Sequence, residues 1–376
     1  MKRVLIVQPF GIGDAIFLTP LIRSLKKDGC VEKVDLLLGS RTREVFEENP
    51  YVNEIFSLDR DELRRQGFWR SFFEILKLIA LLRKGKYDLL VDCSLSRNYS
   101  FFAKFFVWIP KRIGFDYKKR GLFLTEKIAL PFGYKDKHVI QYYMELGNLV
   151  GLHVSDGKPD FFTSDQEKKR AAEFLEHQGL STKSSFIVVA PGGGESWGKD
   201  AHFKRWKPSF FADLIDKISK ELEFDAVVVL GSSAEFDLGE EVISTLTVKR
   251  PSFNLCGKIS LRESAALLKK ALFLLANDSG MVHVARALEV PLVGLYGPVD
   301  EKVYGPYPLG PQYLALGREG LECRPCYQSF RYNAACEHRE CLTRWYPDQV
   351  LDKILKSGFL SQLGQMKLTA RVGRTF

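Results

Sequence analysis

Residues 272–296 contain the feature that most constrains the fold: an apolar run of strand length, a polar turn, a helical segment and a second apolar run. The runs 272–276 and 291–296 are short and continuous, which is typical of strands buried on both faces. A helix between two such strands makes them parallel, because parallel neighbours need a long crossover connection. The polar turn is therefore expected at the carboxyl edge of a parallel sheet.

The same alternation runs through both halves of the chain and predicts an α/β fold of two Rossmann-like, doubly wound domains. Strands are expected at 4–7, 34–38, 87–92, 186–190, 226–230, 272–276 and 291–296. Helices are expected at 14–27, 42–48, 70–83, 208–222, 265–272 and 281–288. Ser260 and Glu263 have the spacing of a capping box before the helix at 265–272.

A polar segment at 155–167 contains glycine and proline and is expected to link the halves. We therefore predict an N-terminal domain at 1–160, a C-terminal domain at 161–345, and a helix with a basic tail at 346–376. The carboxyl ends of the two sheets are expected to face a central cleft.

Composition places the chain among ordinary globular proteins, with 45% apolar and 27% charged residues over 376 positions. No apolar run approaches the roughly 20 residues that span a bilayer. The first strand begins at residue 4, so no signal peptide is expected. The seven cysteines are an odd number, which favours a cytoplasmic protein with reduced thiols.

The net charge of +9 is concentrated in the first half, where residues 1–150 include 26 basic and 18 acidic side chains. The excess is densest at 97–137, where basic residues alternate with phenylalanine, tryptophan and tyrosine. Such a surface suits nucleic acid, anionic lipid headgroups or a phosphorylated substrate. Most of the phenylalanines are expected in a core, whereas core packing does not account for the whole charge excess.

The turn at 277–283 is a candidate seat for a diphosphate with a polar group attached. Backbone N–H groups at a helix N-terminus favour an anion. Ser279 adds a hydroxyl, Gly280 permits close approach, and His283 lies one turn further on the same face. The alternative is that Asp278 or Ser279 only caps the helix, and position alone does not separate the two interpretations.

Two further glycine-containing turns follow predicted strands. Gly13 and Asp14 lie between the first strand and the first helix, without the G-x-G-x-x-G pattern of dinucleotide binding. A carboxylate there stays ionised and is a candidate general base, although a simple N-cap is the plainer interpretation. Gly192 and Gly193 follow the strand at 186–190 and lead to Lys204 and Arg205, either of which suits a phosphate.

Two motifs suggest metal, with different weight. Asp59-Arg60-Asp61 matches a D-x-D pattern, but a three-residue match before a predicted helix is better explained by capping, and we reject it as a metal site. Cys323, Cys326, Cys336 and Cys341 form a compact group that contains C-x2-C. A structural zinc site and free thiols are equally compatible with it, and a labile disulfide is less so.

Taken together and in order, these segments resemble glycosyltransferase family 9, the heptosyltransferases of the lipopolysaccharide inner core. The resemblance covers about residues 2–355, and it rests on the ordered set of segments 4–14, 204–206, 278–283 and 296–298, with 87–92 and 112–115 similar. The chain departs from the family pattern at Lys207, where a proline is usual, and its tail from 358 matches nothing in the family.

The resemblance implies a GT-B fold and an inverting glycosyltransferase that needs no metal or other cofactor. It aligns Asp14 with the catalytic carboxylate and Lys204 with the phosphate-binding lysine. Donor-binding positions fall on Gly13, Gly192, Gly193, Glu235, Asp278, Ser279, Gly280 and His283. It further implies that the helix at 348–356 packs back on the N-terminal domain.

The partners that follow are a nucleotide-sugar donor, ADP-heptose, and a phosphorylated, lipid A-linked acceptor met at the inner face of the cytoplasmic membrane. Arg97, Arg112 and Lys118 are the acceptor candidates in the basic half. No specific nucleic acid is expected.

Other functions remain open on the sequence. A family member using a UDP- or GDP-linked sugar for surface polysaccharide would keep the same phosphate-binding residues. A nucleotide-sugar epimerase would need acid and base groups flanking the sugar, for which Asp14 and His283 are thin support. A nucleic-acid-binding protein would use the basic half but leave the diphosphate seat unexplained. A degenerate, nonenzymatic member is disfavoured because Asp14 and Lys204 are both present.

Overall fold

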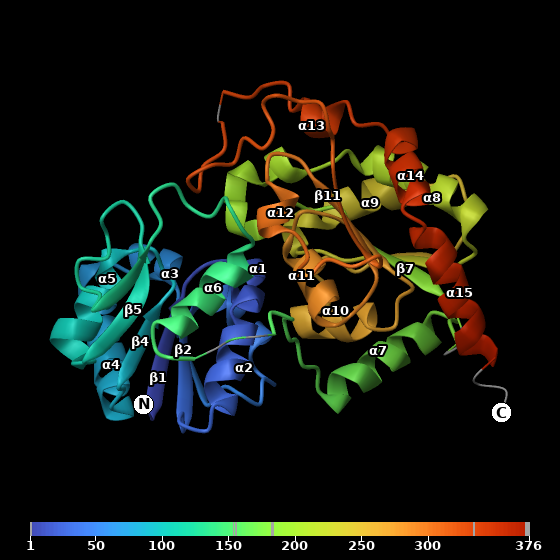
Figure 1. The fold of residues 1–376 in the computed structure, drawn as a ribbon. Coiled ribbons are helices and arrows are strands. Elements are labelled where there is room, and N and C mark those ends of the chain that lie inside the picture. The colour runs from blue at the N-terminus through green and yellow to red at the C-terminus, as the bar shows by residue number, and fades with distance from the viewer. Residues whose placement is uncertain (1, 153, 155, 182–183, 334, 373–376) are drawn as a thin grey trace. The chain divides into compact units, whose positions relative to one another are not determined.

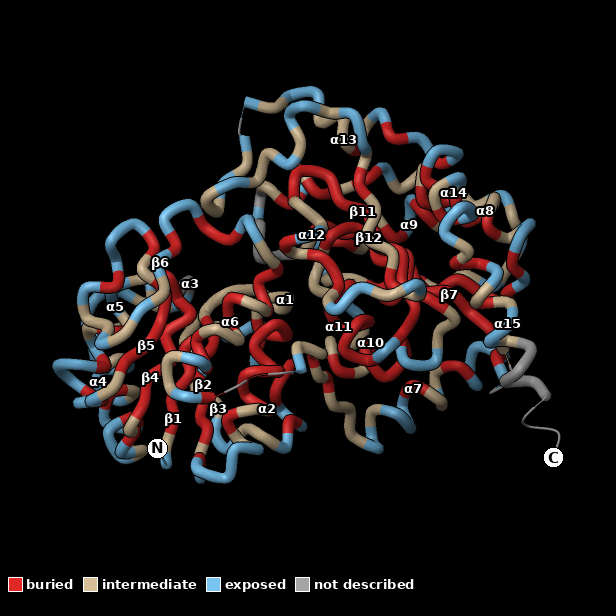
Figure 2. Tube along the Cα trace, in the orientation of Figure 1, coloured by how far each residue is buried: buried red, intermediate tan, exposed pale blue. Residues whose placement is uncertain are grey.

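The computed structural model describes residues 2–152, 154, 156–181, 184–333 and 335–372. It divides into two compact units, unit 1 (Met1–Phe162) and unit 2 (Thr163–Phe376), each an α/β layer structure (Figure 1). In both, a six-stranded sheet has helices on its two faces, and the strands nearest the middle of the sheet are buried (Figure 2).

Unit 1 is built on a sheet in which all neighbouring strands are parallel, in the order β3-β2-β1-β4-β5-β6. Its strands are β1 (Arg3–Gln8), β2 (Lys33–Gly39), β3 (Glu54–Leu58), β4 (Leu89–Asp92), β5 (Lys111–Asp116) and β6 (Glu126–Ala129). The helical elements are α1 (Ile12–Phe17), α2 (Thr19–Lys27), η1 (Ser40–Val45), α3 (Arg60–Arg65), α4 (Phe68–Gly85), α5 (Arg97–Phe102), the π-helical turn η2 (Ala103–Val107) and α6 (Val139–Asn148).

Unit 2 repeats this topology with the order β9-β8-β7-β10-β11-β12, again with parallel neighbours. Its strands are β7 (Phe186–Ala190), β8 (Ala226–Val229), β9 (Ser252–Asn254), β10 (Leu274–Asn277), β11 (Leu292–Tyr296) and β12 (Tyr313–Gly317). The helical elements are α7 (Asp165–His177), η3 (Glu195–Lys204), α8 (Pro208–Glu221), η4 (Ser233–Glu235), α9 (Phe236–Thr245), α10 (Leu261–Leu268), α11 (Gly280–Ala287), α12 (Glu301–Tyr304), α13 (Glu340–Thr343), α14 (Pro347–Lys356) and α15 (Phe359–Val372).

The predicted α/β class, the parallel sheets and the capping box of Ser260 and Glu263 are confirmed. Two predicted helices differ: the segment expected at 14–27 forms α1 and α2 with a break at Leu18, and the segment expected at 42–48 forms the 3-10 helix η1. Pro20 lies in the first turn of α2. A proline there costs no hydrogen bond, because the first N–H groups of a helix have no partner within the helix.

The C-terminal helices belong to the compact unit 2, and the predicted packing of 348–356 on the N-terminal domain stays a prediction. Helix α14 packs on α8, and its Val350 and Ile354 belong to the apolar core of unit 2. The tail continues as α15, whose Phe359 and Leu363 join the same core, while residues 373–376 lie outside the described residues. Burial of this apolar stripe explains why both helices stay with unit 2.

Within the part of the chain that the structure describes, none of the helices combines the length and the apolar character needed to cross a lipid bilayer.

Candidate active site

The most informative group in unit 2 is a buried ion pair between Lys204, the last residue of η3, and Asp278, which follows β10. Lys204 Nζ lies 2.8 Å from Asp278 Oδ2, and the two side chains are 8% and 6% exposed. The geometry of this contact is not that of a hydrogen bond, so Oδ2 can still accept one from a ligand hydroxyl. A buried ion pair contributes little net stability, because desolvation of both charges offsets their attraction. Its presence at a strand end therefore points to a binding role.

Asn277 at the end of β10 holds the loop of Lys204 in place. Its Nδ2 donates to the carbonyl of Pro191 over 2.7 Å, and its Oδ1 accepts from the Trp206 N–H at 3.2 Å. Trp206 is fully buried and its ring N–H donates to the Trp345 carbonyl over 2.7 Å. Two loops that are far apart in sequence are thus fastened to the end of one central strand.

The glycines after β7 are required by close packing. A Cβ on Gly192 would lie 1.8 Å from Glu235 Oε1, and one on Gly193 would lie 2.3 Å from the Ala201 carbonyl oxygen. Glu235 accepts from the Gly194 N–H at 3.3 Å and from the Ser232 N–H at 2.9 Å. Its carboxylate therefore connects the loops that follow β7 and β8.

Polar atoms without a partner gather beside the ion pair. Among the described residues, Ser279 Oγ and Tyr296 OH are buried and make no hydrogen bond. Burial, with a contribution from the Asp278 charge, raises the pKa of Tyr296 well above its usual value, so it is a neutral donor. Buried polar groups normally have partners, and a group of unpaired ones at a sheet edge indicates a ligand site.

The N-terminus of α11 faces this group. Ser279 is its N-cap residue with an extended backbone, yet its side chain makes no capping hydrogen bond, and Asp278 is engaged with Lys204. The alternative that these two residues only cap the helix is therefore wrong. Gly280 begins α11, and His283 lies buried one turn later.

Unit 1 carries its candidate carboxylate in the same kind of place. Asp14 lies in the first turn of α1, with Gly13 before it, and the N-cap residue is Gly11. Asp14 is half-buried, and it is not the N-cap, so that simpler interpretation is wrong. Burial, together with the Asp14 charge, raises the pKa values of Cys93 and Tyr143 well above their usual range, which places Asp14 near both side chains.

A second carboxylate, which the motifs did not single out, lies at the end of β4. Asp92 is 4% exposed and accepts from the Ser94 N–H at 2.9 Å and from its hydroxyl at 2.5 Å. Burial raises the pKa of Asp92 to about 6 despite these hydrogen bonds. The signal available in the sequence was an apolar strand ending in a carboxylate, and strongly perturbed carboxylates in such places are often functional.

The three acceptor candidates differ in their surroundings. Arg112 is buried and donates to the backbone carbonyls of Phe123 (2.7 Å), Pro110 (2.7 Å) and Ile109 (2.5 Å), and burial lowers its pKa. These bonds account for Arg112 as a structural residue of unit 1. Arg97, at the start of α5, and Lys118, whose ammonium lies 5.0 Å from the Tyr117 ring centre, are exposed.

The described residues give no support to the zinc site that was considered for the cysteine group. All seven cysteines are free, and among the described residues no three His, Cys, Asp or Glu side chains form a group that could hold a metal ion. Burial raises the pKa of Cys326, and that of Cys341 to about 11, with further contributions from the neighbouring cysteines. The structural zinc interpretation is therefore unsupported.

The segment that contains these cysteines braces the candidate site instead. Arg324 donates to the Gly297 carbonyl over 2.7 Å and pairs with Glu301, just after β11. Arg339 donates to the His202 carbonyl over 2.8 Å, close to Lys204 in the chain. The rejected metal motif is likewise explained by folding, since Asp59 accepts from the Glu62 N–H at 2.9 Å as a cap of α3.

Comparison with known proteins gives consistent results. The model of glycosyltransferase family 9 (heptosyltransferase) matches residues 75–334. Lipopolysaccharide heptosyltransferase 3 of Escherichia coli K12 is 24% identical, over 78% of this chain and 82% of that protein. Lipopolysaccharide heptosyltransferase 2 of Salmonella typhimurium LT2 is 27% identical, over 79% of this chain and 83% of that protein.

Two solved structures share the fold. E. coli ADP-heptose lipopolysaccharide heptosyltransferase II has a TM-score of 0.70 at 23% identity, covering 96% of this chain and 99% of that one. E. coli heptosyltransferase WaaC with ADP has a TM-score of 0.68 at 17% identity, covering 95% and 100%. The predicted arrangement of two Rossmann-like units as a GT-B fold is confirmed.

Proposed function

The chain belongs to glycosyltransferase family 9 and is a glycosyltransferase, and from this premise we propose that it transfers a heptose from ADP-heptose to a phosphorylated lipopolysaccharide core acceptor. The observation that carries the proposal is the group of buried polar atoms around the Lys204–Asp278 ion pair at the N-terminus of α11. It combines a cation, helix N–H groups and hydroxyl partners, which together suit a sugar diphosphate.

The donor is held in unit 2. Lys204 and the N–H groups at Ser279 and Gly280 bind the diphosphate, and Asp278 Oδ2 accepts from hydroxyls of the sugar. Asp278 also orients the Lys204 ammonium. Gly192 and Gly193 bring backbone close to the ligand, Glu235 holds their loop, and His283 lines the same helix face.

Asp14 is the general base. It takes the proton from the acceptor hydroxyl as that oxygen bonds to the anomeric carbon, while the bond from that carbon to the diphosphate oxygen breaks. Attack from the face opposite the diphosphate inverts the anomeric centre. The negative charge that develops on the leaving ADP is stabilised by Lys204 and the α11 N-terminus, so we propose that transfer requires no metal ion.

The acceptor is a lipid-linked, phosphorylated sugar, which places the reaction in the cytoplasm at the inner face of the cytoplasmic membrane. The charge excess of the first half supports this, with exposed Arg97 and Lys118 as acceptor contacts. Arg112 is no longer among them, because its guanidinium is used within unit 1.

The first test is thermal unfolding of the purified chain with ADP, ADP-heptose, UDP- and GDP-sugars and adenosine, in the presence of a chelator. A ligand at 100 times its Kd stabilises the protein by about 2.7 kcal/mol. ADP and ADP-heptose should stabilise most. Lys204→Ala should abolish the preference for ADP over adenosine, whereas Lys220→Ala, at an exposed position of α8, should not.

The ratio of ADP to adenosine binding is unaffected by any general loss of stability in Lys204→Ala. Preference for a UDP- or GDP-sugar would show that the donor is not ADP-heptose, while the chain would still be a glycosyltransferase. A chain that responds to no nucleotide would contradict the donor site itself.

A further inference from the structure

Helix α4 of unit 1 leaves most of its apolar surface uncovered. Of its 18 residues, only Ile79 and Leu82 are buried. Phe68 is 74% exposed, Trp69 70% and Phe73 64%, and the rings of Phe68, Trp69, Phe72 and Phe73 contact one another. Single exposed apolar side chains are ordinary, but a contiguous group of large ones marks an interaction site.

The segment formed by α5 and η2 extends this surface. The Arg83 guanidinium near the end of α4 lies 4.0 Å from the ring centre of Trp108, and its Nε donates to the Phe106 carbonyl. Phe102, Phe105, Phe106 and Trp108 are exposed. We name the combined surface the aromatic face: Phe68, Trp69, Phe72, Phe73, Leu76, Phe102, Phe105, Phe106 and Trp108.

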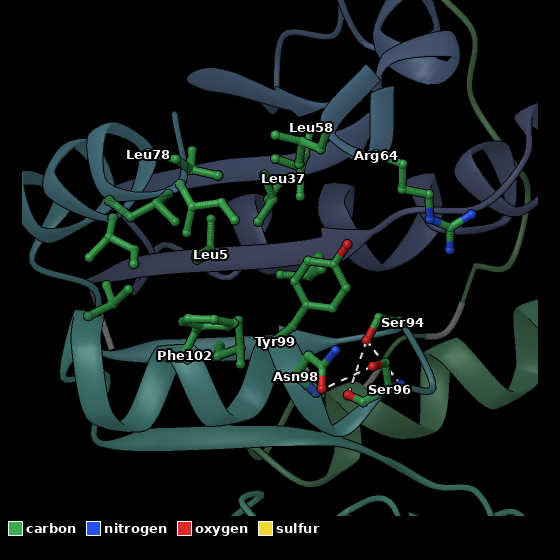
Figure 3. Close-up of a pocket in the computed structure, with 18 residues that line it drawn as sticks. Leu5, Leu37, Leu58, Arg64, Leu78, Ser94, Ser96, Asn98, Tyr99 and Phe102 are labelled. Atoms are coloured by element: carbon green, nitrogen blue, oxygen red, sulfur yellow. Dashed lines mark hydrogen bonds between the residues drawn. The ribbon is translucent and has the colours of Figure 1, made fainter. Parts of the chain in front are cut away.

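A pocket of about 310 Å³ lies between α4 on one side and α5 and η2 on the other (Figure 3). Apolar side chains such as Leu5, Leu37 and Leu78 line most of it. Polar groups lie together at one end, where Figure 3 shows Arg64, Ser94, Ser96 and Asn98. An apolar channel with a polar end fits a ligand that has an apolar chain and a polar headgroup.

The polar end of the pocket adjoins the candidate catalytic edge of unit 1. Ser94 donates to Asp92 at the end of β4, and β4 pairs with β1, the strand that leads to Asp14 in α1. The pocket therefore leads from the aromatic face to the edge of the sheet where Asp14 lies. A lipid bound with its chain in the pocket would present its headgroup at that edge.

Charge decides which occupant fits the aromatic face. The segments 68–85 and 97–108 contain six basic residues and one acidic residue. Aromatic rings with interleaved Lys and Arg are the pattern of proteins that lie in the headgroup region of an anionic membrane. A second copy of this chain would bring the same basic residues against one another across a two-fold interface, which is unfavourable.

We propose that the aromatic face docks unit 1 on an anionic lipid bilayer and that the pocket beneath it takes one apolar chain of a lipid. The inference deepens the proposed function, because it names the surface on which a lipid-linked acceptor is met. Binding to a bilayer, however, needs neither donor nor transfer, so it can be tested separately.

The test is flotation of the full chain with vesicles of phosphatidylcholine alone or mixed with phosphatidylglycerol. Binding should require phosphatidylglycerol and weaken with salt. Trp69→Ser with Phe73→Ser should lower partitioning at least about tenfold, since both rings lose burial in the interface. Leu309→Ser with Leu355→Ser, at exposed apolar positions of unit 2, should leave it unchanged.

Two further measurements separate the face from the pocket. Brominated lipids should quench tryptophan fluorescence, and Trp69→Phe should remove part of that quenching, because Trp206 and Trp345 are buried. Leu78→Trp, which fills the pocket, should weaken binding of a soluble single-chain lysophosphatidylglycerol while vesicle binding persists.

Equal flotation of the Trp69/Phe73 variant and its control, or no flotation on either vesicle, would overturn the inference. A change of oligomeric state in that variant without a change in flotation would make the face a protein interface instead. If ADP stabilises the protein but flotation fails, the proposed function stands and the docking face is wrong. If the protein floats with vesicles but ADP does not stabilise it, the docking face stands and the proposed donor site is wrong.

Discussion

Helices α4 and α10 connect equivalent strands in the two units, yet their surroundings are opposite. Each precedes the fourth strand of a sheet with the same order. Helix α10 packs on α7, with Arg262 Nη2 donating to Glu167 Oε2 over 2.9 Å, and six of its eight residues are buried. Helix α4 has two buried residues among 18, and its aromatic side chains are exposed (Figure 2).

The difference teaches that one topology can cover its helices in two ways, and in the proposed function these suit two kinds of ligand. Unit 2 closes its helices over a well-packed core and gathers buried charges at the ends of β10 and β11, which suits a small, highly charged donor. Unit 1 places an apolar pocket and an aromatic face beside its carboxylates, which suits a large amphipathic acceptor.

The largest expected effect comes from Asp14→Asn in unit 1. Loss of a general base lowers kcat by about 10²–10⁴-fold. Affinity for ADP should stay unchanged, because the residues proposed to bind the diphosphate are in unit 2. Transfer assays measure the loss of kcat, and ADP titration measures the affinity for ADP. Asp28→Asn is the control, at an exposed carboxylate of unit 1. A variant that keeps full transfer activity would show that the base lies elsewhere.

Asn277→Ala should destabilise unit 2 by about 2–4 kcal/mol, because the Pro191 carbonyl and the Trp206 N–H each lose a buried partner. The Lys204 loop would also lose its attachment, so ADP affinity should fall. Chemical denaturation and ADP titration measure the two effects. Asn98→Ala, at an exposed position of α5, serves as the control. Unchanged ADP affinity would separate loop position from donor binding.

Asp92→Asn should stabilise the protein, and only above acidic pH. Burial raises the folded-state pKa of Asp92 to about 6 from an ordinary 3.8, so the folded state loses stability as pH rises from about 3.8 to about 6, and the loss is complete above that pH. At pH 7.5 the substitution should therefore gain up to about 3 kcal/mol, and near pH 4 the gain should vanish. Denaturation at both pH values measures it. A gain of the same size at both would contradict burial of the charge as the cause.

The smallest effect on stability is expected for Trp69→Ser with Phe73→Ser in α4. Exposed substitutions of this kind change the free energy of unfolding by roughly 0.5 kcal/mol or less. Leu267→Ala in α10, a side chain that is 2% exposed, should cost about 2–5 kcal/mol. Urea denaturation of both variants tests the contrast directly. A large loss from the α4 variant would mean that its aromatic rings serve the fold rather than a partner.

The inner strands of both sheets, except β5, could be predicted from the sequence, whereas the edge strands could not. β1, β4, β7 and β10 are continuous apolar runs because they are covered on both faces. The edge strands β3, β6, β9 and β12 are short or only partly buried, and their sequences lack that pattern. A half-covered strand has no run of apolar residues to reveal it.

The candidate site, too, could be predicted from the sequence only in part. Sequence position located Asp14, Lys204 and the 277–283 turn at strand ends, because a parallel sheet brings all carboxyl ends to one edge. It did not show that Lys204 pairs with Asp278 or that Asn277 fastens the loops, since these contacts join segments more than 70 residues apart. The raised pKa of Asp92 arises from burial, which no local pattern encodes.

What the sequence by itself determined is the alternation of elements and the residue types placed at their junctions, because strand and helix periodicity and turn chemistry are local properties. What only the tertiary structure decided is which surfaces are covered. The residues of α4 predict an amphipathic or buried helix, yet exposure depends on whether another element packs against it, as α7 packs on α10. The ion pair, the unpaired hydroxyls and the aromatic face all depend on which segments, distant in sequence, pack against one another.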